Sequence, residues 1–153
     1  MRTIALISCS KKKLKTNKRV SAENLYSPST LFSTSLKYAR MRNVDQIAIL
    51  SAKHHLLGLD TWIKPYNKTL KEMGKEEIEA WYSVTGDALY YYLIGNKIEK
   101  VILLAGKKYY KGLIPYIKKT GCKILLPLKG MPIGERVAFM KEEIKQENIR
   151  SLI

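Results

Sequence analysis

Four short apolar runs alternate along the chain with longer segments in which apolar residues recur every three or four positions. The runs cover residues 3–8, 46–51, 100–105 and 123–127 and are rich in Ile, Leu and Val. Continuous apolar runs of this length are typical of strands that are buried on both faces of a parallel sheet. We therefore expect each run to form an interior strand.

The segments between these runs carry the spacing and the end signals of helices. Ser29 precedes the first helical pattern as a start signal, and Gly95 and Gly121 follow the second and third patterns as stop signals. Pro132 is suited to an early position in the last helix. The predicted helices cover residues 31–42, 75–94, 108–119 and a final segment from 132 onward.

This alternation predicts an α/β fold with one domain over residues 1–153. Connections between parallel strands are right-handed in almost all proteins, so the helices should cover both faces of a mainly parallel, four-stranded sheet. The expected architecture therefore has three layers. Ligands bind such sheets beyond the carboxyl ends of the strands. The segments that follow the four strands are the expected site.

The chain is strongly basic, with 28 Lys and Arg against 13 Asp and Glu and a formal charge of +15. This excess is larger than the solubility of a small domain requires, and it indicates a polyanionic partner. DNA is the first candidate, because Lys and Arg that neutralise phosphates release counterions. RNA and nucleotides carry the same kind of charge and remain alternatives.

Cysteine usage and hydropathy exclude several classes of protein. Cys9 and Cys122 form no CxxC pair, which favours reduced thiols over a disulfide or a zinc site. His54 and His55 have no third ligand at a suitable spacing. No apolar run approaches the roughly 20 residues of a membrane span, and the first run precedes its charges, the reverse of a signal peptide. We expect a cytoplasmic protein that uses no membrane, metal or other cofactor.

Every predicted strand is followed by small residues and a lysine. If these segments meet at one edge of the sheet, their N–H groups, hydroxyls and cations surround a crevice that suits an anion. The residues expected to bind substrate are Ser8, Cys9, Ser10, Lys11, Ser51, His55, Tyr66, Gly106 and Tyr109. Those expected to bind nucleic-acid phosphates are Lys12, Lys13, Lys15, Arg19, Lys107 and Lys108, with residues 12–19 forming a flexible rim. Taken alone, such a charge run is more often a solvated loop.

A long mixed segment, residues 50–70, links the second strand to the second helix. A compact domain seldom keeps so long a loop unless the loop has a function. Asp60 is the one acidic residue in this segment. It is a candidate catalytic carboxylate, although an isolated Asp caps a turn equally often. Lys53, which closely follows the strand, is the second candidate catalytic residue.

Several of these blocks resemble a known family. LSAKHHLLGLDTWIKPYNKTLKEM at residues 50–73 is similar to the "LSGLYGLL, LD, PY" signature of the YaaA peroxide-stress proteins, and ISCSKKK at 7–13 is similar to their "ISPAK" turn. With LLAGKKYY and LPLKGMPIG, the chain looks even more like small bacterial and phage domains related to YaaA. YaaA proteins bind DNA, so the resemblance implies DNA binding. The matched positions are Ser8, Ser10, Lys11, Ser51, Leu57, Asp60, Pro65, Tyr66, Gly106 and Tyr109.

The expected core is also similar to that of uracil-DNA glycosylases, an analogy at the level of fold. It suggests an enzyme that cleaves or exchanges the N-glycosidic bond of a modified or damaged base. The sugar then gains oxocarbenium character, which the carboxylate of Asp60 would stabilise. Alternatively, Lys53 would attack the sugar carbon and form a Schiff base. Tyr66 or Tyr109 would stack on the flipped base.

A second class of function fits the same residues. A non-catalytic DNA-binding protein of stress response or phage defence would use the lysines to follow the backbone and the tyrosines as stacking platforms. An enzyme of free nucleotides is a third alternative, ranked last because the cations extend beyond one crevice.

Overall fold

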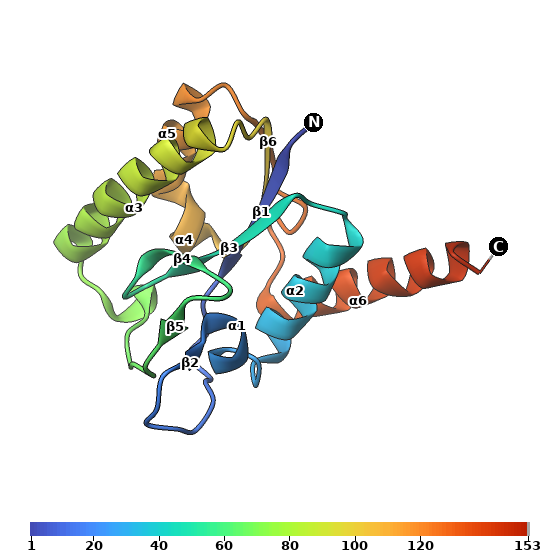
Figure 1. Cartoon of the computed structure of the whole chain (residues 1–153), viewed down its shortest axis with the longest axis horizontal. Helices are drawn as coiled ribbons and strands as arrows, with labels where there is room; N and C mark the ends of the chain where they lie inside the picture. Colours follow the sequence, from blue (N-terminus) through green and yellow to red (C-terminus); the bar gives the residue numbers. More distant parts are fainter. Residues whose placement is uncertain (153) are drawn as a thin grey trace.

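A mixed five-stranded sheet lies between two layers of helices in the computed structural model, which describes residues 1–152 (Figure 1). The strand order is β4-β3-β1-β6-β7, with β1, β3, β6 and β7 parallel and β4 antiparallel to β3. The predicted α/β class is confirmed, and all four predicted strands are present. The strands are β1 (Thr3–Ser8), β3 (Gln46–Ser51), β4 (His55–Gly58), β6 (Lys100–Leu104) and β7 (Lys123–Leu125).

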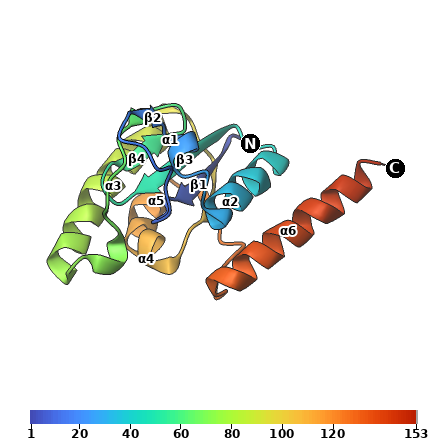
Figure 2. The ribbon, with the colours of Figure 1, turned by 90° about the horizontal axis from the view of Figure 1, so that it is seen from below.

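The helices form the two outer layers, with α2 and α6 on one side of the sheet and α3, α4 and α5 on the other (Figure 2). A two-stranded antiparallel sheet, β2 (Val20–Ser21) and β5 (Trp62–Ile63), lies beside the main one. The helices are α1 (Ala22–Leu25), α2 (Thr30–Met41), α3 (Lys75–Gly95), α4 (Lys107–Tyr110), α5 (Ile114–Lys119) and α6 (Ile133–Arg150), and the 3-10 turns are η1 (Leu70–Glu72) and η2 (Lys111–Leu113).

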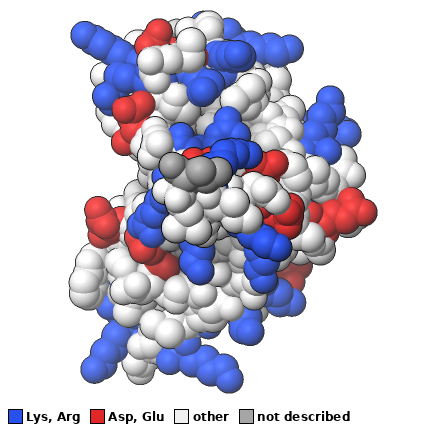
Figure 3. Space-filling model, turned by 90° about the vertical axis from the view of Figure 1, so that its right-hand side faces the viewer, with Lys and Arg blue, Asp and Glu red and all other residues white. Residues whose placement is uncertain are grey.

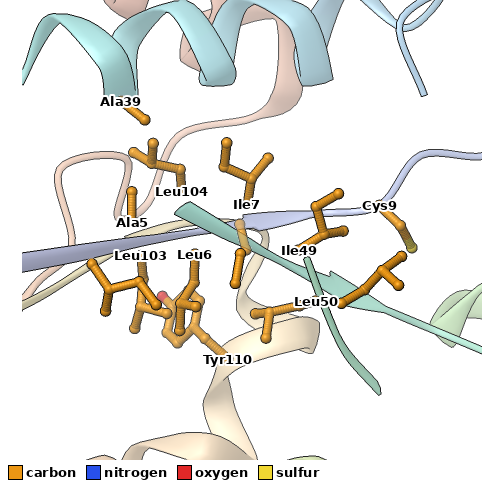
Figure 4. Packing of buried hydrophobic residues seen from close by; sticks show 14 of the residues in the cluster. Ala5, Leu6, Ile7, Cys9, Ala39, Ile49, Leu50, Leu103, Leu104 and Tyr110 are labelled. Carbon is orange, nitrogen blue, oxygen red and sulfur yellow. The ribbon is translucent and has the colours of Figure 1, made fainter. Parts of the chain in front are cut away.

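Strand β1 is the centre of the core. It pairs in parallel with β3 on one side and with β6 on the other, and its residues 4–7 are buried. Leu6 and Ile7 lie on opposite faces of the sheet among Leu50, Leu103 and other aliphatic side chains (Figure 4). Burial on both faces is why the sequence shows an unbroken apolar run rather than an alternating one.

Strand β4 is the strand of the main sheet that the sequence pattern did not predict, and β2, β5 and α1 were not predicted either. It forms a hairpin with β3, in which Ser51 pairs with His55 and Ala48 pairs with Gly58. The chain reverses at residues 52–54 without Gly, Pro or Asn, and His55 adopts a left-handed conformation with φ of 63°. Hairpin turns are usually recognised by Gly or Asn at the position of positive φ. This turn has His55 there, so the sequence carries no recognisable signal for it.

The third predicted helix is divided in the structure. The segment from residue 107 to 119 forms α4, η2 and α5 in succession, not one helix. Pro115 lies in the first turn of α5, where its missing N–H costs no hydrogen bond. A helix that ran through this position would lose that bond, so the chain tightens into a 3-10 turn first.

The order of the strands creates a switch point between β1 and β6. From the carboxyl end of β1 the chain passes through α2 to β3 on one side, and from the carboxyl end of β6 it passes through α4 and α5, on the opposite face, to β7 on the other side. The two connections leave the sheet in opposite directions, so a crevice opens beyond the carboxyl ends of β1 and β6. Across residues 1–152, every helix is too short or too polar to span a lipid bilayer.

We expect substitution of Gly86 by Ala to destabilise the fold. A Cβ atom at Gly86 in α3 would lie 2.5 Å from Cδ2 of Tyr116 in α5, so the ring would have to move. Overpacking of this kind costs about 1–3 kcal/mol, partly offset by the better helix propensity of Ala. Chemical denaturation should show a lower free energy of unfolding for Gly86→Ala. Gly134→Ala in α6, where a Cβ meets no atom within 4 Å, is the matched control and should be neutral or stabilising. Equal stabilities of the two variants would contradict the packing between α3 and α5.

Candidate functional site

A pocket of about 560 Å³ lies at the switch point beyond β1 and β6. Four segments that are distant in the sequence form it: the turn after β1, the start of α2, the turn η1 and the residues from Gly106 into α4, with the first turn of α6 closing one side. Nine of the residues predicted for the site line it: Ser8, Cys9, Ser10, Lys11, Lys12, Gly106, Lys107, Lys108 and Tyr109. The expectation that strand ends converge is therefore met for β1 and β6.

The turn after β1 forms the floor of this pocket. Cys9 extends the β1–β3 ladder through a 2.9 Å bond from its N–H to the carbonyl of Leu50. Its thiol accepts a 3.5 Å bond from the N–H of Ala52 and lies 3.4 Å from the hydroxyl of Tyr109. Ser10 donates its hydroxyl to the carbonyl of Lys12 at 2.8 Å, so the loop folds back on itself. These contacts give the floor a defined shape.

Cations dominate the polar lining of the pocket. Six lining residues are basic, namely Lys11, Lys12, Lys71, Lys107, Lys108 and Arg136, whereas Glu72 is the one acidic residue among them. The ion pairs found within residues 1–152 join Arg40 to Glu23, Lys68 to Glu77 and Arg150 to Glu147, all outside the pocket. The pocket cations are therefore available to a ligand of negative charge.

Arg136 is the most firmly positioned of these cations. Its Nε donates a 2.8 Å bond to the carbonyl of Met131, which fixes the side chain at the start of α6. The guanidinium lies against Gly106: a Cβ atom there would be 3.3 Å from Nη1. A planar guanidinium presents a fork that matches phosphate or carboxylate oxygens. This arrangement suits a terminal phosphate at the end of β6.

Apolar side chains form the remaining wall. Leu31 and Phe32 from α2 and Ile133 from α6 line the pocket together with Tyr109. Burial raises the pKa of Tyr109, so its phenol stays neutral and can donate a hydrogen bond. A ligand with a flat apolar part and an anionic part matches this combination of wall and cations. A nucleotide has both parts.

A smaller hollow of about 230 Å³ adjoins the main pocket and shares Lys107 and Arg136 with it. The segment after β7 lines this hollow through Leu128, Lys129 and Met131. The segment after the fourth predicted strand therefore reaches the same edge of the sheet, but it lines the adjoining hollow and not the main pocket.

The end of β3 supports the loops beside the pocket instead of lining it. Ser51 is fully buried, and its hydroxyl lies 2.9 Å from that of Tyr66, which lies 2.6 Å from that of Tyr26. Ser51 also accepts a 2.9 Å bond from the N–H of His54. Burial raises the pKa of Tyr26 to about 12 and raises the pKa of Tyr66 as well. The structure therefore places Ser51 and Tyr66, both predicted to bind substrate, in a buried network of neutral hydroxyls.

Lys13 is half-buried, unlike the other lysines of the basic loop, residues 11–19 between β1 and β2. Its ammonium lies 4.4 Å from the centre of the Tyr66 ring and 3.3 Å from the carbonyl oxygen of Lys11. Burial lowers the pKa of Lys13. The side chain thus ties the loop to the tyrosine network, whereas Lys12, Lys15 and Arg19 are exposed.

The predicted catalytic residues lie apart from the pocket. Asp60 is exposed in the turn between β4 and β5 and is not among the lining residues. Lys53 is exposed, with its ammonium 5.8 Å from the centre of the Tyr66 ring. His55 is held against α3 by a 2.9 Å contact between Nδ1 and the hydroxyl of Thr85.

Several lining residues were missed by sequence reasoning, namely Ser29, Leu31, Phe32, Thr69, Lys71, Glu72, Ile133 and Arg136. They come from helix starts and from η1, not from the segments directly after strands. Arg136 is one basic residue among many in the sequence, and only the packing of α6 against α2 brings it to Gly106. Within the described residues, His, Cys, Asp and Glu side chains form no group of three that could hold a metal ion.

Comparison with known protein families gives one finding. The sequence model of a family described as "Family of unknown function (DUF6884)" matches residues 4–142, which include the sheet except Thr3 and the whole lining of the pocket. No curated protein and no solved structure matches the chain.

We expect Arg136→Gln to weaken binding of a nucleoside 5′-monophosphate by about tenfold or more, because a charge-assisted hydrogen bond contributes about 1.5–3 kcal/mol. Isothermal titration calorimetry would measure the change. Arg150→Gln, at the exposed end of the same helix, is the matched control and should bind as the wild type does. Equal affinities of all three proteins would remove Arg136 from the site.

We also expect stability to fall as the pH rises above about 10. Tyr26, Tyr66 and Tyr109 have raised pKa values in the fold, but they ionise near pH 10 once unfolded. The folded state then binds more protons than the unfolded state, so the free energy of unfolding decreases with pH, by up to about 1.4 kcal/mol per pH unit for each phenol. Urea denaturation from pH 8 to 11 should show this decline. The free energy of unfolding of Tyr66→Phe should decline less steeply with pH than that of the wild type. An unchanged slope would contradict the burial of this phenol.

Proposed function

This chain belongs to the family of unknown function DUF6884, and we propose that it acts on nucleic acid by holding one nucleotide in the pocket between β1 and β6. The proposal depends on the convergence at this pocket of cations that form no ion pair within residues 1–152. Lysines from two strand ends and Arg136 from α6 surround a floor of small polar residues. Phosphates would contact the cations, and the base would lie against Leu31 and Tyr109.

The charge outside the pocket favours a polymer over a free nucleotide. Lys107 and Lys108 reach the rim, and the exposed Lys12, Lys15 and Arg19 continue the positive surface along the next loop. A mononucleotide would leave these cations unused, whereas a strand would bind them through its successive phosphates. The formal charge of +15 agrees with such a partner.

Cleavage or exchange of an N-glycosidic bond is the reaction that we propose for the bound nucleotide. The sugar gains positive character as the bond to the base breaks, so a carboxylate beside the pocket would stabilise it. Glu72 is the carboxylate that lines the pocket. We therefore assign this role to Glu72 in place of Asp60, which does not line the pocket. Water would add to the sugar carbon as the bond to the base breaks, while Tyr109 and backbone N–H groups would assist the departing base, which takes up a proton.

A non-catalytic nucleic-acid-binding protein is the second candidate, and one observation favours it. Glu72 is exposed, and no second carboxylate lines the pocket among residues 1–152. Enzymes that cleave glycosidic bonds commonly use two carboxyl groups. In this case the pocket would hold a base or a strand end without breaking any bond.

Release of a free base from DNA tests the proposal. The purified protein would be incubated with genomic and phage DNA that carries natural or modified bases, and mass spectrometry would detect free bases while alkaline cleavage reveals abasic sites. We expect Glu72→Gln to lower the rate of release by at least about a hundredfold, in the range typical of a lost acid or base group. Asp60→Asn is the matched control and should retain activity.

Each outcome decides between the candidates. Release that depends on Asp60 but not on Glu72 would restore the assignment based on sequence. No release from any DNA, together with binding that weakens steeply with salt, would establish the non-catalytic protein. Absence of both release and binding would reject nucleic acid as the partner.

A further inference from the structure

Trp62 is a large aromatic side chain left in solvent beside the basic loop. It is 63% exposed, whereas Trp81, the other tryptophan, is 3% exposed. A tryptophan on a protein surface is a large apolar area that a binding partner can cover. The surroundings of Trp62 therefore indicate which partner would cover it.

The backbone holds Trp62 in this outward position. Strand β5 pairs with β2, so that Trp62 lies opposite Ser21 and Ile63 lies opposite Val20. Ile63 is buried in the core. Because neighbouring side chains of a strand point to opposite faces, burial of Ile63 turns Trp62 outward. The N–H of Ala22 donates a 2.8 Å bond to the carbonyl of Thr61 and anchors the strand at its start.

A basic residue contacts the backbone of Trp62, and further basic residues lie on the same loop. Nη1 of Arg19 lies 3.5 Å from the carbonyl oxygen of Trp62, and the charges of Lys53 and Arg19 contribute to the lowered pKa of His54, after its burial. Lys15 and Lys18 are exposed on the same loop. The lowest part of Figure 3, at the height of this loop in Figure 1, shows basic side chains and no acidic ones.

The loop between β1 and β2 connects this surface to the pocket. Lys11 and Lys12, at its beginning, line the pocket, and Arg19, at its end, contacts Trp62. The N–H of Leu14 donates a 2.8 Å bond to the carbonyl of Leu25, which holds the middle of the loop against α1. A chain of phosphates that follows the loop from the pocket would therefore pass from Lys11 to Trp62.

We propose that Trp62 stacks on an unpaired base of a single-stranded nucleic acid whose neighbouring nucleotide occupies the pocket. Arg19 and the loop lysines bind the phosphates between them. The faces of bases in a duplex are covered by their neighbours, so an exposed indole finds a free face only on an unpaired base. This inference rests on the proposed function and adds to it a second contact and a preference for single strands.

Binding of oligothymidylate tests the inference. The wild type should bind this single strand more tightly than a duplex of equal length, and its tryptophan emission should be quenched on binding, because Trp62 is accessible and Trp81 is buried. Trp62→Ala should weaken single-strand binding by about tenfold, at the lower end of measured stacking contributions. Duplex and mononucleotide binding should stay unchanged. Fluorescence anisotropy would measure the affinities.

Tyr91→Ala provides a matched control. Tyr91 is an exposed aromatic residue, 73% accessible, near the end of α3 where Tyr92 contacts Gln46 at the start of β3, and so at the opposite edge of the sheet. The Tyr91→Ala variant should bind oligothymidylate as the wild type does. Unchanged affinity and unchanged quenching in Trp62→Ala, with binding retained, would overturn the stacking role while leaving the proposed function in place. An equal loss in both variants would show an effect that is not specific to Trp62. Failure of the wild type to bind any nucleic acid would reject both.

Discussion

Parallel pairing of β1 on both of its edges is the constraint on which the rest of the structure depends. A strand in this position must be apolar on both faces, and the connection that leaves β1 runs to β3 while the connection that leaves its other neighbour, β6, runs in the opposite direction to β7. The turns after β1 and β6 consequently separate, and the space between them is the pocket. The hydrophobic requirement of the central strand and the position of the candidate site thus have one cause.

The buried hydroxyl network sets the shape of the edge next to the pocket. Ser51, Tyr66 and Tyr26 satisfy one another's hydrogen bonds, Ser51 and Tyr26 being fully buried, and Lys13 folds onto the Tyr66 ring. An unpaired hydroxyl buried at this place would cost free energy, so each member holds the others in position. This network fixes the beginning of the basic loop, whose later residues remain exposed. Within this loop, Lys13 supports the structure, whereas the exposed residues that follow it are available to contact a ligand.

The distribution of charge leaves the cations of the pocket available to a ligand. The acidic residues that form ion pairs, Glu23, Glu77 and Glu147, lie on outer helices, whereas the pocket cations have only the exposed Glu72 among them. Mutual repulsion of such cations disfavours the empty pocket and strengthens attraction to an anion. The resemblance to YaaA agrees with this distribution and stays a prediction, because the matching family has no described activity.

The sequence by itself determined the four parallel strands, the positions of three long helices and the residues that follow β1 and β6, because continuous apolar runs and helix end signals act over short distances in the chain. It did not reveal β4, whose turn depends on a left-handed histidine, nor the break before Pro115 in a region of good helix periodicity. Only the tertiary structure brought Arg136 and Glu72 to the pocket and left Asp60 outside it. Their positions depend on how whole helices and turns pack on the sheet, and no local pattern of residues encodes such long-range contacts.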